Sequence, residues 1–178
     1  MVDLFAGIPE ENIVKSLDWI SQNLDKVGLE GGHTLRRHTD IQVRALQFRL
    51  KEEDVRFATS FWDAEIAAAV VLELLQKNYQ AEIRRWLRRN GRDDLVLTGR
   101  FPKSVGYGFR KGVMTLEENL KQACVTLVED LQADWGFRVL TSYPIFERRD
   151  VIEKVNPASG YYGWKVPNPM REKSKIPA

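Results

Sequence analysis

The sequence predicts an α+β fold in which helices come first and an antiparallel sheet follows. In residues 9–89, apolar side chains recur every three or four positions over several stretches, which is the spacing of amphipathic helices. From residue 94 onward, short runs rich in Val, Leu, Thr, Phe and Tyr alternate with turn-forming residues, a pattern that favours strands. Helices followed by strands within one chain are typical of an α+β domain.

Four helices are expected in the first half of the chain. The first begins near Pro9, whose fixed φ suits a first helical turn, and ends at Gly28. Each of the other three follows a residue whose side chain can cap the first turn. These helices run from the cap Asp40 to Lys51, from the cap Asp63 to Gln76, and from the cap Asn78 to about Arg89. The second of these three is apolar on several faces, so we expect it to lie centrally.

Five strands are expected, and two of them form a hairpin. The strands are Phe57–Phe61, Leu95–Thr98, Val105–Phe109, Gln122–Glu129 and Phe137–Tyr143. The glycines inside the third indicate a bulge or bend, and residues 133–136 form the expected hairpin turn. We therefore expect one domain over residues 1–146, with a leading helix (1–28) and a body (31–146), followed by an extended tail (147–178).

Composition excludes several classes of protein. The 178 residues are 43% hydrophobic and 29% charged, as in ordinary globular proteins, and the net charge of +2 indicates no particular partner. The single cysteine, Cys124, rules out an internal disulfide, and one cysteine with two histidines gives no zinc-site spacing. The longest apolar run, Ile66–Leu72, is far too short to span a bilayer, and no signal peptide precedes the first helix. We expect no membrane insertion and no cofactor.

Candidate chemistry is concentrated in Gly31–His38, which holds both histidines of the chain, His33 and His38, with two arginines between them. Histidine is the side chain whose unperturbed pKa suits proton transfer near neutral pH. The chain has neither a phosphate-binding loop of the Walker type nor a Gly-x-Ser-x-Gly elbow. Histidines, arginines, hydroxyls and aromatics fit cleavage of a phosphodiester by its own 2′-hydroxyl, a reaction that needs a base, an acid and a cation.

Several short motifs occur in one order and resemble a known family. They are Gly31–Thr34 with Arg37-His38, Leu46-x-x-Arg49-Leu50, Ala58–Asp63 and Arg138–Pro144. Over residues 30–144 the chain resembles the ribonuclease-A-like toxin domain at the C-terminal tips of bacterial contact-dependent inhibition (CdiA) proteins and other polymorphic toxins. The resemblance implies a fold similar to pancreatic ribonuclease without its disulfides, metal-free RNA cleavage and a dedicated immunity protein.

The resemblance also implies roles for individual residues. It implies a catalytic group of His33, Arg44, Thr141 and Tyr143, with Arg37 and Arg49 as rivals of Arg44 for the phosphate cation. The substrate-binding residues that we expect are His38, Arg37, Thr59, Ser60, Arg88 and Arg89. The alternatives are structural: His38 as a helix-surface contact, Thr59 and Ser60 as helix caps, and the basic cluster between Arg84 and Lys111 as a solvated surface.

The function expected from these observations is that of a metal-independent ribonuclease toxin. It would cut RNA, with tRNA among the candidates, in the cytoplasm of a target bacterium. Delivery would need a secretion system that this chain does not encode, and the chain would be monomeric without its inhibitor. One alternative is a non-catalytic RNA-binding or protein-interaction module on the same fold. A second alternative, supported by composition alone, is a structural or regulatory partner protein.

Overall fold

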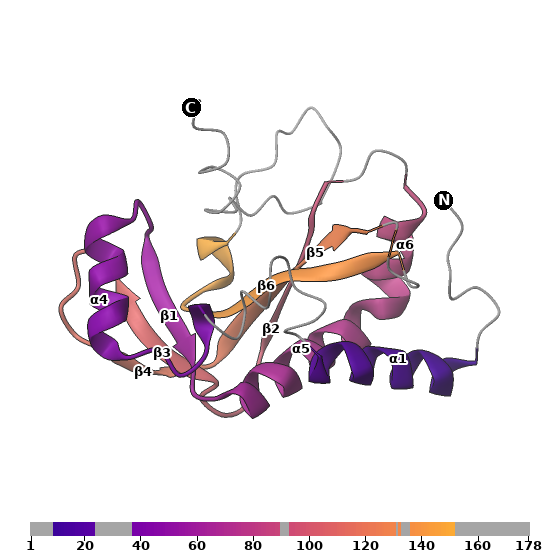
Figure 1. Cartoon of the computed structure of the whole chain (residues 1–178), viewed down its shortest axis with the longest axis horizontal. Coiled ribbons are helices and arrows are strands. Elements are labelled where there is room, and N and C mark those ends of the chain that lie inside the picture. The colour runs from indigo at the N-terminus through magenta and orange to yellow at the C-terminus, as the bar shows by residue number, and fades with distance from the viewer. Residues whose placement is uncertain (1–8, 24–36, 90–92, 131, 133–135, 152–178) are drawn as a thin grey trace.

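The computed structural model describes residues 9–23, 37–89, 93–130, 132 and 136–151, and it has the expected α+β architecture (Figure 1). The described helical elements are α1 (Glu10–Gln22), α4 (Val43–Glu52), α5 (Ala64–Asn78), the π-helical turn η1 (Tyr79–Ile83), α6 (Arg84–Leu87) and the 3-10 turn η2 (Arg148–Asp150). The strands are β1 (Phe57–Phe61), β2 (Leu95–Arg100), β3 (Gly106–Arg110), β4 (Glu117–Leu120), β5 (Gln122–Glu129) and β6 (Phe137–Ile145). None of the helices in these ranges is long and apolar enough to cross a membrane.

The strands form two antiparallel three-stranded sheets, with the orders β1-β3-β4 and β2-β5-β6. The bulge expected from the glycines of β3 is present as a register shift between Gly106 and Gly108. A Cβ atom at either glycine would collide with a backbone carbonyl of β1, so glycine lets the two strands approach closely. The antiparallel pairing of β5 with β6 is also confirmed, whereas residues 133–135 of the expected turn lie outside the described part of the chain.

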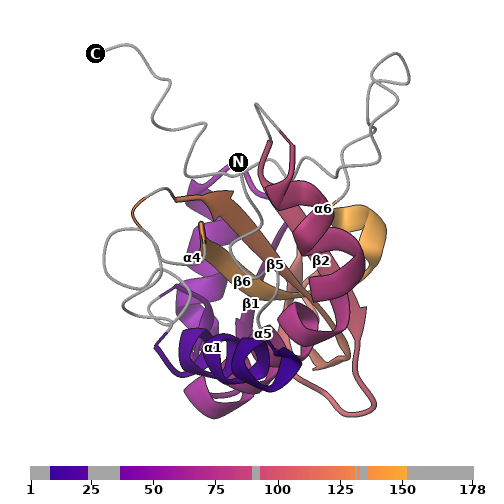
Figure 2. The same ribbon diagram turned by 90° about the vertical axis from the view of Figure 1, so that its right-hand side faces the viewer.

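Helix α5 occupies the centre of the main core, as its apolar composition predicted. Five of its side chains are buried, namely Ala67, Val70, Val71, Leu74 and Leu75. They pack between α1 and one face of the β2-β5-β6 sheet, and both views place α1 and α5 on the same side of that sheet (Figures 1 and 2). Helix α4 packs instead on the β1-β3-β4 sheet, through Leu46.

Two of the expected helix caps are corrected by the structure. Asp40 is not the cap of α4, because its φ of 50° lies in the left-handed region and the helix begins after Gln42. Asn78 starts no new helix, because α5 continues through η1 into α6 and the Asn78 side-chain amide donates back to Leu74 O at 2.7 Å. The cap at Asp63 is confirmed, since its carboxylate accepts from Ile66 N at 2.8 Å. Helix α1 ends at Gln22, which is earlier than the end predicted at Gly28. Residues 90–91 and 152–178, which include most of the expected tail, lie outside the described part of the chain.

Candidate active site

The two sheets meet where β1 lies beside β6, and this junction gathers several of the residues singled out by sequence. The Thr59 hydroxyl of β1 donates to Pro144 O of β6 at 2.6 Å, which joins the sheets. The Ser60 hydroxyl accepts from Ile41 N at 3.0 Å and donates to Phe61 O at 2.8 Å. The exposed fractions of Thr59 and Ser60 are 2% and 0%. These two hydroxyls hold the backbone of the site together. Either hydroxyl could bind a substrate only if it gave up one of these internal hydrogen bonds.

His38 is held against this junction by the segment that follows it. Arg37 and His38 are helical, Thr39 forms a parallel bridge with Phe61, and Asp40 N donates to Phe61 O at 3.0 Å. The half-buried His38 ring lies on the Tyr143 ring of β6, with 5.1 Å between centroids and 39° between planes. The structure thus brings together one of the two histidines and the predicted tyrosine.

Tyr143 is buried in an apolar environment, and this environment keeps its phenol protonated. The Phe57 ring also packs against it, at 5.9 Å between ring centroids. Burial raises the pKa of Tyr143 well above its ordinary value, the Cys124 thiol raises it further, and Arg49 lowers it only in part. Burial also raises the pKa of Cys124 to about 12, so this thiol stays neutral and packs as a small apolar side chain. Tyr143 therefore stays protonated over the physiological pH range.

Two arginines share one carboxylate beside Tyr143. Arg37 donates to both oxygens of Glu53, at 2.8 and 3.1 Å, while Arg49 Nη1 donates to Arg37 O at 3.2 Å and Arg49 Nε lies 3.7 Å from Glu53 Oε2. Burial lowers the pKa of Arg49, as does the charge of Arg37, and Glu53 raises it in compensation. Arginine nevertheless stays charged in proteins. The Arg49 guanidinium also acts electrostatically on Tyr143, where it lowers the pKa of the phenol.

Arg44, the predicted phosphate cation, lies on a different side of α4. It is exposed on the first turn of the helix, five positions before Arg49. At 100° per residue, five positions rotate the two side chains by about 140° around the helix axis. Among the described residues, Arg49 interacts electrostatically with Tyr143, and no described interaction joins Arg44 to another predicted site residue. Geometry therefore favours the rival, Arg49.

Thr141 and Tyr143 lie on the same face of β6, as their spacing predicted. Thr141 is half-buried and lies opposite Thr126 of β5 in the strand register. The Thr126 hydroxyl is buried and has no hydrogen-bond partner among the described residues. Sequence reasoning missed Thr126, because only the β5-β6 register places it beside Thr141. A buried hydroxyl without a hydrogen-bond partner is unusual in a folded protein, and this one lies directly opposite the predicted site residue Thr141.

The remaining predicted residues lie elsewhere. Arg88 and Arg89 are exposed directly after α6, at the end of the molecule away from α4 and the β1-β6 junction (Figures 1 and 2). They therefore lie at a distance from His38. His33 lies outside the described residues, so its predicted role stays a prediction.

We expect the double substitution Arg88→Gln, Arg89→Gln to raise KM and flatten its salt dependence while kcat barely changes. Phosphate contacts far from the scissile bond add sequence-independent binding that weakens with salt through counterion release, and they leave the chemical step alone. The measurement is initial rate against RNA concentration at several salt concentrations. The charge-matched control is Lys15→Gln, Lys77→Gln on α1 and α5. Equal KM and equal salt slopes for the two double variants would assign Arg88 and Arg89 to a surface that RNA does not contact.

Comparisons with known proteins agree with this fold. A family model described as the bacterial CdiA-CT RNAse A domain matches residues 32–144. The fold is similar to the crystal structure of a CdiA-CT/CdiI complex from Y. kristensenii 33638, with a TM-score of 0.59 and 24% sequence identity. That likeness covers 64% of this chain and 99% of the other chain, and it confirms the predicted fold. No curated protein sequence matches at a significant level.

Proposed function

Since the chain belongs to the bacterial CdiA-CT RNAse A domain family, a family of toxin ribonucleases, we propose that it cleaves RNA without a metal by transphosphorylation. The observation that supports this mechanism is the His38–Tyr143 ring contact of 5.1 Å beside the Arg49 guanidinium. A base, a neutral proton donor and a cation are the three groups that the reaction needs.

The proposed reaction assigns one group to each step. His38 accepts the proton of the ribose 2′-hydroxyl as its oxygen attacks the adjacent phosphorus. Arg49 stabilises the charge that develops on the non-bridging phosphate oxygens. The bond from phosphorus to the 5′-oxygen breaks, and the Tyr143 phenol donates its proton to that oxygen. The products are a 2′,3′-cyclic phosphate and a free 5′-hydroxyl.

Other residues would assist these three. Thr141, on the same face of β6 as Tyr143, would orient the phosphate, with Thr126 beneath it. Arg37 would fix Arg49 through their shared partner, Glu53. The sequence-based prediction that His33 is the base or acid remains an alternative to this scheme, since His33 lies only five positions before His38 in the sequence.

The biological setting that we propose follows from the family. The catalytic body would act on RNA, with tRNA as one candidate, in the cytoplasm of a target bacterium, after delivery by a system that this chain does not encode. The similar crystal structure is of a CdiA-CT/CdiI complex, which supports a cognate immunity protein for this chain. Without that inhibitor we expect a monomer, with residues 1–146 as the toxin domain and 147–178 as a tail.

Incubation with total bacterial RNA, with and without EDTA, tests the proposal. We expect equal cleavage in both samples, products that end in a 2′,3′-cyclic phosphate, and no reaction on the matching 2′-deoxy oligonucleotide. Cleavage that requires Mg²⁺, or that degrades DNA, would contradict the mechanism. RNA binding without turnover would support the alternative, a non-catalytic RNA-binding module.

A further inference from the structure

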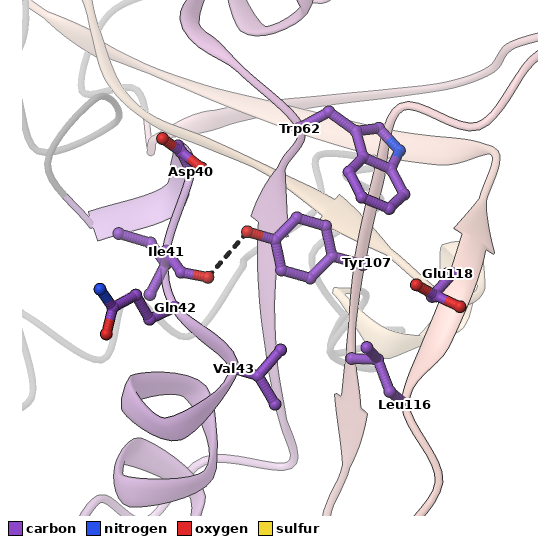
Figure 3. Close-up of a pocket in the computed structure, with 8 residues that line it drawn as sticks. All are labelled: Asp40, Ile41, Gln42, Val43, Trp62, Tyr107, Leu116 and Glu118. Carbon is purple, nitrogen blue, oxygen red and sulfur yellow. Dashed lines mark hydrogen bonds between the residues drawn. The ribbon is translucent and has the colours of Figure 1, made fainter.

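A pocket on the side of the molecule near α4 is not used by the proposed reaction. Its volume is about 250 Å³, and it is lined by Asp40, Ile41, Gln42, Val43, Trp62, Tyr107, Leu116 and Glu118. Figure 3 shows the Trp62 and Tyr107 rings next to each other, with Val43 and Leu116 below them. Asp40 and Gln42 lie on one side of the two rings and Glu118 on the other. The pocket thus has an apolar base and a polar, acidic rim.

Trp62 is held in place although it is well exposed. Its indole Nε1 donates to Ser104 Oγ at 3.0 Å, and its ring lies 4.6 Å from the Tyr107 ring. Tyr107 is itself fixed by a hydrogen bond from its hydroxyl to Ile41 O at 2.7 Å. The exposed fraction of Trp62 is nevertheless 37%. A rigid aromatic face that remains open to solvent is the surface on which nucleobases stack, whatever their identity.

The rim determines which chemical group fits beside that aromatic face. Asp40 and Glu118 are exposed carboxylates, which accept hydrogen bonds and repel phosphate. The ligand must therefore present N–H donors to the rim. Among the four RNA bases, guanine alone offers two adjacent donors on one edge, N1–H and the N2 amino group. These match the two oxygens of one carboxylate in a bidentate arrangement, which is the strong form of such a contact.

The pocket is connected directly to the candidate active site. Asp40 lies two residues after His38, which limits the distance between their Cα atoms to roughly 7 Å. The segment that follows His38 is hydrogen-bonded to β1 through Asp40 N and Ile41 N, which fixes its position relative to β1. A base bound in the pocket would belong to a nucleotide adjacent to the phosphate that is cut.

We propose that this pocket is a base-recognition subsite that takes a guanine next to the scissile phosphate, stacked on Trp62 and hydrogen-bonded to Asp40. The inference rests on the proposed ribonuclease function and adds a sequence preference to it. The carboxylate of Asp40 is assigned rather than that of Glu118 because Asp40 lies on the segment that carries His38. The φ of 50° at Asp40 places an unusual backbone conformation at this point, as is frequent where a side chain is aimed at a ligand.

The test uses oligonucleotides that contain one ribonucleotide in a DNA strand, so that a single bond can be cut. The ribonucleotide and its 3′ neighbour are varied in turn through G, A, C and U or T. For the wild type we expect G at one of these two positions to raise kcat/KM at least tenfold. Trp62→Ala should raise KM about tenfold on that substrate with little change in kcat, as the loss of one stacked base predicts.

Matched variants separate the subsite from general damage. Phe48→Ala removes another exposed aromatic side chain, on α4 and outside the pocket lining, and should change nothing. Asp40→Asn, which tolerates the same backbone conformation, should remove the preference for G, whereas Glu118→Gln should retain it. All-deoxy versions of the same oligonucleotides provide a binding measurement that does not depend on cleavage. We expect Trp62→Ala to weaken binding of the G-containing strand about tenfold.

The outcomes distinguish the subsite from the ribonuclease itself. Cleavage of every oligonucleotide at the same rate, with Trp62→Ala equal to Phe48→Ala, would overturn the subsite and leave the ribonuclease function in place. If the wild type cuts none of them, the ribonuclease function fails. The assignment of the pocket as a guanine-binding site then stands if the G-containing deoxy strand still binds in a Trp62-dependent way, although without a scissile phosphate beside it, and the assignment falls if that strand does not bind.

Discussion

Replacing His38 with alanine is expected to lower kcat/KM for RNA cleavage by about 10²- to 10⁴-fold, the range for removal of a general acid or base. His38 is the histidine that the described structure places against Tyr143, at 5.1 Å between ring centroids. The expected loss is in kcat, because proton transfer occurs in the chemical step. The measurement is single-turnover cleavage of a fluorescent RNA, with circular dichroism to verify that the variant is folded.

Two companion variants identify what His38 does. His38→Phe keeps an aromatic ring on Tyr143 and removes the titratable nitrogens, so it should be as inactive as His38→Ala if the role is proton transfer. Recovery of activity in His38→Phe would instead assign His38 a packing role. His33→Ala tests the sequence-based prediction for the other histidine. A larger loss in His33→Ala than in His38→Ala would place the base in the segment 24–36 and contradict the assignment made from the described geometry.

The elements with strong local signals were predicted correctly from sequence. Helix α5 has a side-chain cap at Asp63 and good helix formers throughout, and the structure confirms both its start and its central position. The strands β5 and β6 are long and β-prone, and they pair as expected. The order of short motifs was equally informative, because it identified the family before any geometry was known.

Features that depend on tertiary contacts were missed. Strand β4 has the sequence Glu-Glu-Asn-Leu, which carries no β-strand signal and forms a strand only because it pairs with β3. The division into two sheets escaped prediction for the same reason, since β1 comes from the helical half of the chain and pairs with β3. Likewise, Trp62 and Glu118 lie far apart in sequence, so the pocket that they share could not be read from spacing.

The sequence also could not determine which arginine contacts the phosphate. Sequence favoured Arg44 over Arg49 by resemblance alone, but the two differ in burial and in direction around α4. The side chain of Arg49 is 15% exposed and is tied to Arg37 and Glu53, whereas Arg44 is exposed on the first turn. A cation that stabilises a transition state is most effective when it is fixed and partly shielded from water.

We therefore expect Arg49→Gln to lower kcat by about 10²- to 10³-fold, as loss of one stabilising donor does in other enzymes, and Arg44→Gln to change it less than about threefold. The two variants remove the same charge from the same helix, so a general electrostatic effect would lower activity equally in both. Because Arg49 also contacts Glu53, thermal unfolding should accompany the kinetics, together with Glu53→Gln, which removes the partner and retains the cation. The opposite result would be a folded Arg49→Gln enzyme with wild-type kcat and an inactive Arg44→Gln enzyme. It would identify Arg44 as the cation that contacts the phosphate, and α4 would then have to rotate or shift when RNA binds.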